Sequence, residues 1–163
     1  MPPNIVAFLQ NQWFREPDRA SKILALYENR KPEEGREQFI RDFLFFGCLT
    51  GKRLRAAFGE ELCGEIVWEE VSPKLGGKAS SVFPADRQHI RRVIAKHQPG
   101  LVIAFGKVAA DGIGDLVDVP ILYAPHPAAR GPATVPLLLE TAAQVREFIK
   151  GSEVQACLTT STT

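Results

Sequence analysis

The clearest candidate for chemistry is the stretch LYAPHPAARG, from Leu122 to Gly131, where an apolar run ends at His126. An imidazole can donate or accept a proton near neutral pH, so His126 is a candidate catalytic group. It is also a candidate metal ligand, or a side chain that caps the strand end by bonding to backbone. Because the chain has only three histidines, three cysteines and no CxxC pair, a zinc site is disfavoured. We predict neither a metal ion nor another cofactor.

Polar or aromatic side chains follow three other apolar runs, namely Gln10, Asn11 and Trp13, the pair Glu69 and Glu70, and Lys107. Asn11 can orient a water molecule, although its amide cannot accept a proton at neutral pH. Glu69 and Glu70 have the chemistry of an acid pair, but adjacent strand residues point to opposite faces. At most one of these two carboxylates is therefore expected in a site. Lys107 either supports a phosphate or is an exposed lysine.

Basic residues are clustered locally, although the whole chain carries a formal charge of only +1. The clusters are Lys52 with Arg53 and Arg55, and Arg91 with Arg92. No overall basic field indicates nucleic-acid binding, but a local basic patch is compatible with it. The alternative interpretation of each cluster is a solvated helix face.

Apolar runs predict four strands, at residues 5–9, 65–71, 101–105 and 120–124. Between the second and third strands, glycine and serine predict a flexible loop at residues 72–83. Helical periodicity and capping residues predict helices at residues 18–29 with Asp18 as N-cap, 37–46, 51–58, from Asp86 as N-cap to the turn at 97–100, 106–110, and 135–149. His89 and His97 fall on or directly after one of these helices, where we expect exposure to solvent.

Strands that alternate with helices and have no polar face predict a parallel sheet covered on both sides. We expect a three-layer α/β/α fold with a mainly parallel sheet of four or five strands, in a single domain over residues 1–150. Residues 151–163 are predicted to form a flexible tail. Ligands of such folds bind outside the carboxyl ends of the strands. The unusual residues all follow strand ends, so we predict that they meet at one rim of the sheet.

The sequence lacks the signatures of several common protein classes. No stretch approaches the roughly 18 apolar residues of a membrane span, and no basic leader precedes an apolar segment, so we expect a cytoplasmic protein without a membrane partner. Gly47 to Lys52 is one residue short of a P-loop, and Arg53 stands where a serine or threonine is required. No GxGxxG or GxSxG motif is present. We favour a monomer.

Four segments, in their order along the chain, resemble motifs of the uracil-DNA glycosylase superfamily. They are LQNQWF at residues 9–14, FGCLTGKRL at 46–54, PGLVIAFGKVA at 99–109, and APHP at 124–127 followed by Arg130. The first resembles the GQDPYH-type motif, and the last resembles the HPS-type motif. The four segments span most of residues 5–131. The resemblance implies a uracil-DNA glycosylase-like fold that excises a base from DNA after flipping it into a pocket.

The resemblance also implies roles for the residues of these segments. His126 would donate a hydrogen bond to the leaving base, which stabilises the charge that develops on it. Asn11 occupies the position where many members have a water-activating aspartate and mismatch-specific members have an asparagine. These two residues are therefore the predicted catalytic groups. The implied partner is DNA, with one nucleobase in the pocket.

Substrate contacts are implied for further residues of the same motifs. Gln10 matches a glutamine near the base, Trp13 would form a wall of the pocket, and Phe46 matches the phenylalanine that stacks on the base. Without the resemblance, aromatic residues such as these more often pack in a core. Arg130 falls in the segment that enters the minor groove. Lys107, Lys52 and Arg53 are the other predicted DNA contacts.

The sequence departs from the family pattern at two points. The family usually ends its second strand with an asparagine that reads uracil, and here Glu69 and Glu70 lie in that neighbourhood. A carboxylate accepts where the asparagine amide donates, so it suits a base that presents an amino or ring N–H group. Three dispersed cysteines cannot supply the four thiolates of the family's iron–sulfur cluster. We therefore predict a divergent member without this cluster, and we assign no particular base.

Two other functions are compatible with the same residues. The first is a binding module for nucleobases or nucleic acid that has the fold but no catalytic activity, which Asn11 and the altered second strand favour. The second is a hydrolase of free nucleosides or nucleotides, which would not need a basic DNA-binding face. Excision of a base from DNA distinguishes the glycosylase from both.

Overall fold

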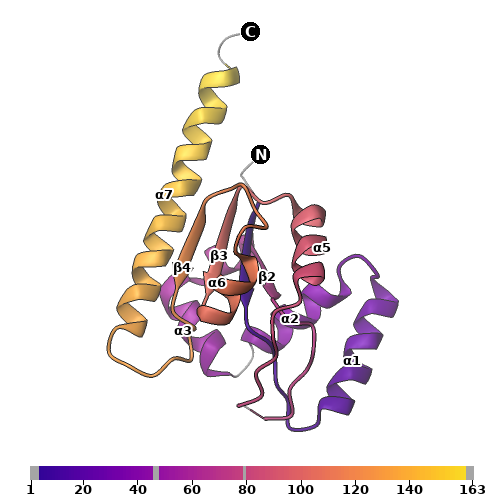
Figure 1. The fold of residues 1–163 in the computed structure, drawn as a ribbon. Helices are drawn as coiled ribbons and strands as arrows, with labels where there is room; N and C mark the ends of the chain where they lie inside the picture. Colours follow the sequence, from indigo (N-terminus) through magenta and orange to yellow (C-terminus); the bar gives the residue numbers. More distant parts are fainter. Residues whose placement is uncertain (1–3, 46–47, 79, 161–163) are drawn as a thin grey trace.

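Four short apolar strands form one parallel sheet in the computed structural model, which describes residues 4–45, 48–78 and 80–160. The strands are β1 (Ile5–Leu9), β2 (Ile66–Glu70), β3 (Leu101–Phe105) and β4 (Ile121–Ala124), in the order β2-β1-β3-β4 (Figure 1). Every neighbouring pair is parallel. This confirms the predicted mixed α/β class and the parallel sheet, with four strands.

The register of the sheet brings the carboxyl ends of the strands to one rim. Leu9 of β1 pairs with Glu70 of β2, and Phe105 of β3 pairs with Ala124 of β4. From the central strand β1 the chain proceeds to β2 on one side, whereas β3 lies on the other side. Such a switch point opens a crevice at the carboxyl ends of the strands.

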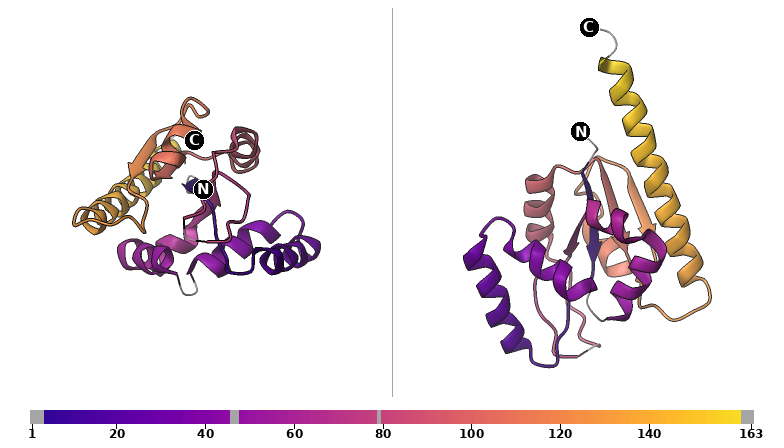
Figure 2. Two further views of the ribbon diagram at one scale, coloured as in Figure 1. Left: turned by 60° about the horizontal axis from the view of Figure 1, so that its bottom comes forward. Right: turned by 180° about the vertical axis from the view of Figure 1, so that it is seen from behind.

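Helices cover both faces of the sheet, and seven are present within the described residues. Figure 2 shows α1, α2 and α3 on one side of the sheet and α5 on the other. The bounds are α1 (Pro17–Arg30), α2 (Gly35–Phe45), α3 (Leu49–Phe58), α4 (Glu60–Glu65), α5 (Arg87–His97), α6 (Lys107–Ile113) and α7 (Thr134–Thr160). This arrangement is compatible with three α/β/α layers.

Two hydrophobic cores follow from the alternation of side chains along the strands. Ile5, Ala7 and Leu9 of β1 face the core that the sheet shares with helices α1 to α4 and α7, whereas Val6 and Phe8 face the core beneath α5 and α6. All five residues of β1 are buried. Burial of each large apolar side chain stabilises the fold by about 1.5–3 kcal/mol. The rim residues are therefore attached to a rigid central strand.

Several helix boundaries differ from the sequence-based predictions. Helix α1 begins at Pro17 with Glu16 as its N-cap, so the prediction of Asp18 as N-cap was wrong, and Asp18 lies in the first turn. Proline fits the first turn because its missing N–H has no partner there. Helix α4 was not predicted, since it is short and follows α3 directly at Gly59, whose φ is +80°. Asp86 is confirmed as the N-cap of α5.

Helix α7 continues to Thr160, beyond residue 149 where its amphipathic pattern was predicted to end. The single domain over residues 1–150 and the flexible tail over 151–163 stay predictions. Among the helices of the described residues, none combines the length and apolarity that a bilayer crossing requires.

Candidate active site

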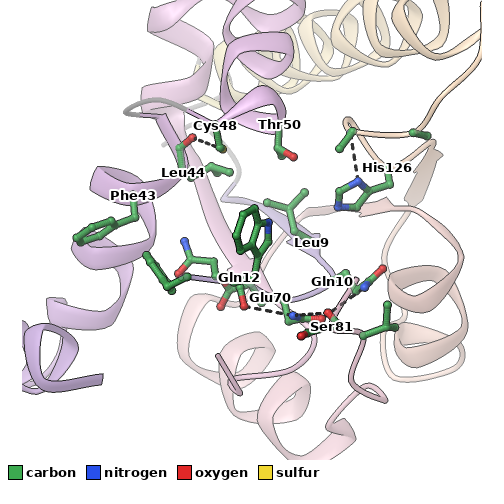
Figure 3. Close-up of a pocket in the computed structure, with 16 residues that line it drawn as sticks. Leu9, Gln10, Gln12, Phe43, Leu44, Cys48, Thr50, Glu70, Ser81 and His126 are labelled. Carbon is green, nitrogen blue, oxygen red and sulfur yellow. Dashed lines mark hydrogen bonds between the residues drawn. The ribbon is translucent and has the colours of Figure 1, made fainter. Parts of the chain in front are cut away.

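A cavity of about 390 Å³ opens at the rim of the sheet (Figure 3). Its walls come from the end of β1, from β2, from the facing ends of α2 and α3, and from the two loops that contain Ser81 and His126. The lining residues are Leu9, Gln10, Asn11, Gln12, Trp13, Phe14, Phe43, Leu44, Cys48, Thr50, Glu70, Ser81, Val82, His126, Ala128 and Ala129. The rim of the switch point is thus a concave and largely apolar site.

Five of the residues predicted from the sequence line this cavity together. They are Gln10, Asn11, Trp13, Glu70 and His126, which come from three separate parts of the chain. Figure 3 shows His126 on one side of the cavity and Glu70 on another. The predicted meeting of these residues at one rim is therefore observed.

Other predicted site residues lie elsewhere. Glu69 is buried but does not line the cavity, in agreement with the expectation that at most one carboxylate of the pair lies in a site. Phe46 lies outside the described residues. Lys52 and Arg130 are exposed and lie outside the cavity lining. Lys107 is also exposed, and its ammonium forms an ion pair with Asp111, one helical turn further on, at 2.7 Å.

His126 is half-buried in the loop that follows β4, and its environment selects a neutral ring. The backbone N–H of Ala128 donates to His126 Nδ1 at 3.2 Å, so the neutral ring carries its proton on Nε2. Burial lowers the pKa of His126 below its usual value of 6.5. At neutral pH the imidazole is therefore an uncharged hydrogen-bond donor through Nε2–H.

The position of His126 depends on Gly106, which directly follows β3. Gly106 has a φ of +85°, and a Cβ built there would lie 3.1 Å from His126 Cβ. Its N–H donates to Ala124 O at 2.8 Å, which joins the ends of β3 and β4. A side chain at residue 106 would be strained and would displace the histidine. The Phe-Gly-Lys segment thus acts on the site through its glycine.

Arg53, which the sequence predicts to contact DNA, contacts the loop of His126 in this structure. Its Nη1 donates to Pro127 O at 2.7 Å and to Ala129 O at 2.9 Å. Thr134 Oγ1 donates to the same Ala129 O at 3.3 Å. Carbonyls bonded to a guanidinium are held more firmly than carbonyls bonded to water. The N-terminal part of α3 therefore fixes the conformation of the loop.

Asn11 connects the end of β1 to the loop at residues 72–83. Its Nδ2 donates to Gln12 O at 3.2 Å and to Ser81 O at 3.1 Å. Its Oδ1 accepts from Phe83 N and from Gln10 Nε2, both at 3.4 Å. Both ends of the amide are thus bonded within the protein. Among these partners the side chain of Gln10 is the one that is not a backbone group, so a bound water can take the place of its Nε2 as a donor to Asn11 Oδ1.

The loop at residues 72–83 is held against the extension of β1. The backbone of Gly76 receives a hydrogen bond from Phe14 N and donates one to Gln12 O, each at 2.8 Å. Trp13 forms an isolated parallel bridge with Gly76 and stays 45% exposed at the cavity. A Cβ at Gly76 would lie 2.5 Å from Ser81 Cβ, which explains the glycine at this position.

A buried charge cluster stands behind the Glu70 side of the cavity. Arg36 Nη2 donates to Glu70 Oε2 at 2.8 Å, and Arg36 Nε lies 3.6 Å from Glu69 Oε2. His89 Nε2 lies 3.4 Å from the same Glu69 oxygen. The expectation that His89 is exposed was wrong. This residue lies on the face of α5 that packs against the sheet, next to Glu69, and it is only 7% exposed. His97 is also largely covered, and its Nε2 lies 2.8 Å from Glu37 Oε1.

Glu70 has an unusual electrostatic environment. The pKa of its carboxyl is raised to about 8, chiefly by burial and also by the negative charge of Glu69, while the positive charge of Arg36 opposes the shift. Its Oε1 is buried and has no hydrogen-bond partner within the part of the chain that the structure describes. Gln12, which also lines the cavity, likewise has a buried oxygen, Oε1, without a hydrogen-bond partner among the described residues. Sequence patterns missed Gln12 and Arg36, since each looks like an ordinary polar residue of a loop or an exposed connection.

Comparisons with protein-family models, with curated proteins and with solved structures found no match for this chain. In the described part of the chain, no group of three or more histidine, cysteine, aspartate or glutamate residues is arranged to hold a metal ion. The functional interpretation therefore rests on the cavity, the neutral imidazole and the two unpartnered oxygens.

Proposed function

We propose that this protein is a DNA glycosylase-like enzyme that binds a base flipped out of DNA and hydrolyses its N-glycosidic bond. The observation that carries the proposal is His126, a neutral imidazole whose Nε2–H is left for a ligand of the same cavity that Asn11 and Trp13 line. The ordered resemblance of four segments to the uracil-DNA glycosylase superfamily supports it. A concave apolar site with a few polar groups suits a nucleobase.

The proposed chemistry separates charge between the sugar and the base. As the glycosidic bond breaks, the sugar gains oxocarbenium character and the base gains negative charge. His126 Nε2–H donates to a carbonyl oxygen of the departing base, in a cavity where little water screens the interaction. Water adds to the anomeric carbon and releases its proton to solvent, while the base leaves as an anion with the bonding electrons and takes up a proton from solvent. Asn11 Oδ1 orients this water without accepting its proton.

Binding to DNA is assigned to the exposed cations near the rim. Arg130 lies four residues after His126 in the same loop region, and Lys52 precedes Arg53 on α3. Lys107 begins α6, directly after Gly106. With a formal net charge of +1, the protein relies on such local contacts. Arg53 contributes indirectly in this proposal, by fixing the loop that presents His126 and Arg130.

The test is excision from duplexes that carry uracil, hypoxanthine, xanthine or a mismatch, with cleavage at the resulting abasic sites as the readout. We expect His126→Ala to lower the excision rate by about 10²–10³-fold, the typical effect of removing one donor to a developing anion. His126→Gln keeps a donor amide and should lose less. Circular dichroism of both variants controls for folding. Absence of cleavage by the wild type on every duplex would overturn the catalytic proposal.

A second candidate function is a binding module on the same fold. The observation that favours it is the full set of hydrogen bonds at Asn11, which gives this amide a structural role. Salt-dependent DNA binding without excision is the expected result for such a module. Free nucleosides belong in the same assays, because release of base from them alone identifies a nucleoside hydrolase.

A further inference from the structure

Two carboxyl groups share one guanidinium at the Glu70 side of the cavity. Glu69 and Glu70 are 3% and 1% exposed, and Arg36 approaches both. If both carboxyls were ionised, this buried group would hold two negative charges against a single arginine charge. An uncompensated buried charge costs several kcal/mol, and a carboxyl avoids this cost by keeping its proton. This geometry favours one neutral carboxyl.

The contacts decide which carboxyl and which oxygen carry the proton. Glu69 has Arg36 and the ring of His89 as neighbours, whereas among the described residues Glu70 forms an ion pair with Arg36 alone. Oε2 of Glu70 already accepts from Arg36 Nη2, which leaves Oε1 for the proton. Oε1 is buried and has no partner among the described residues, and Glu70 lines the cavity. Because Glu70 lines the cavity, a ligand there can supply the acceptor for an Oε1–H group.

We propose that Glu70 determines which base the cavity accepts, and that it does so as a neutral carboxylic acid whose O–H donates to a carbonyl oxygen of the base. Gln12 Oε1, the other unpartnered oxygen, accepts from the ring N–H beside that carbonyl. The ligand class is thus a base with a lactam edge, a carbonyl flanked by a ring N–H. This inference rests on the proposed function, because it takes a flipped base as the ligand.

This assignment reverses the expectation from the sequence alone. An ionised glutamate would accept hydrogen bonds and favour an amino-bearing base. A neutral glutamic acid donates, as the amide of an asparagine does at this place. Cytosine presents an amino group beside an unprotonated ring nitrogen. Its amino donor would face the O–H donor of Glu70, and its ring acceptor would face the Gln12 Oε1 acceptor. Leaving both unpaired should weaken binding by at least tenfold.

The protonation of Glu70 depends on the charged groups around it. Arg36 faces it from α2 and favours the ionised form, whereas Glu69 on β2 favours the neutral form. His89 of α5 contacts Glu69 and acts on Glu70 through it. His126 and Cys48 are the other titratable side chains that line the cavity. Since the pKa of Glu70 is about 8, the acid form predominates at neutral pH and the carboxylate predominates above pH 8.

The experiment measures binding of duplexes that resist excision, with 2′-fluoro-2′-deoxyuridine or 2′-fluoro-2′-deoxycytidine at one mismatched position. At about pH 6.5 we expect the uridine duplex to bind at least tenfold more tightly than the cytidine duplex. One pH unit above its pKa a carboxyl is about one-tenth neutral, so at about pH 9 uridine binding should fall about tenfold. The affinity for the cytidine duplex should not show this fall between about pH 6.5 and about pH 9.

Two variants separate Glu70 from other causes of pH dependence. Glu70→Gln keeps a donor and cannot ionise, so its preference for uridine should persist at both pH values. Glu69→Gln removes the negative charge that helps to keep Glu70 neutral, so the loss of uridine binding should begin at a lower pH than in the wild type. An infrared carbonyl band of a protonated carboxyl should be present in the wild type at neutral pH and absent in Glu70→Gln. Lack of this difference would show that Glu70 is ionised and would overturn the proposal.

The outcomes distinguish this inference from the proposed function. Selective, pH-dependent binding without excision of unmodified uracil supports the role of Glu70 and contradicts the enzymatic activity. Excision with equal binding of both fluorinated duplexes supports the activity and contradicts the role of Glu70. A pH dependence that persists unchanged in Glu70→Gln also contradicts it. Absence of binding to any duplex at low salt overturns both proposals.

Discussion

The two sides of the cavity that contain His126 and Glu70 are held in place by different kinds of interaction. The loop of His126 is fixed through backbone groups, since Ala128 N–H bonds the ring and Arg53 bonds two carbonyls. Glu70 is fixed through side chains, in a buried cluster with one arginine and a second glutamate. Burial lowers the pKa of the His126 imidazole and raises the pKa of the Glu70 carboxyl, to which the negative charge of Glu69 also contributes. Two polar groups that line one cavity are thus held in place by different contacts.

The largest expected effect comes from removing the cation behind Glu70. Arg36→Met leaves Glu69 and Glu70 without their shared partner, and breaking a buried ion pair costs about 3–5 kcal/mol. We expect the free energy of unfolding in urea to fall by about this amount at neutral pH. Arg19→Met is the matched control, because Arg19 pairs with Glu16 on the surface, where such pairs contribute about 0–1 kcal/mol. Equal losses in the two variants would contradict the buried-cluster interpretation.

The pH dependence of stability provides the next effect. The folded-state pKa of Glu70, about 8, lies above its ordinary value of 4.5, so between these values the native state binds more protons than the unfolded chain. Stability should therefore fall as pH rises from about 5 to about 8, by up to about 1.4 kcal/mol per pH unit from this group. Urea unfolding at several pH values measures the slope.

Two substitutions assign this slope to its source. Glu70→Gln should remove the contribution, because the amide does not titrate. Glu140→Gln, at an exposed position on α7, should leave the slope as it is in the wild type. A wild-type slope that survives in Glu70→Gln would show that the cluster does not hold the proton on Glu70.

The smallest effect concerns the loop of His126. Arg53→Lys keeps the charge but loses the planar group that donates to two carbonyls, so we expect about 1 kcal/mol lower stability and roughly tenfold slower excision. The salt dependence of DNA binding should stay unchanged. Lys52→Ala is the control, which should reduce that salt dependence by about one phosphate contact and leave stability unchanged. A weaker salt dependence in Arg53→Lys would instead indicate a direct contact of Arg53 with DNA.

The difference between these two regions also explains how much of the site is predictable from sequence. All four strands are recognisable because each is a short continuous apolar run, and the residues after each run must meet at one rim. His126 stands out because it follows such a run within a few residues. Arg36, by contrast, lies 34 residues from Glu70, in the charged stretch RKPEEGRE that is typical of an exposed connection. No local pattern shows that this stretch begins a helix that covers the rim.

Burial of a polar side chain explains the wrong prediction for His89. His89 lies on a helix that is polar on average, and only the packing of α5 onto the sheet places it against Glu69. Arg53 belongs to a basic cluster that favours a surface role, and its bonds to loop carbonyls come from the approach of α3 to a segment more than 70 residues later. Charge patterns in a sequence do not indicate which cation finds an internal acceptor.

The contact between α2 and α3 links the two sides of the cavity mechanically. A Cβ at Gly51 would lie 1.8 Å from Leu44 O, so the start of α3 sits directly on the backbone of α2. Helix α2 carries the partner of Glu70 near its first turn, and α3 carries the arginine that holds the histidine loop. Any larger residue at position 51 must separate the two helices and thereby shift both donors together. In directed evolution, base preference and turnover would then change as one linked trait, and this glycine is where the linkage begins.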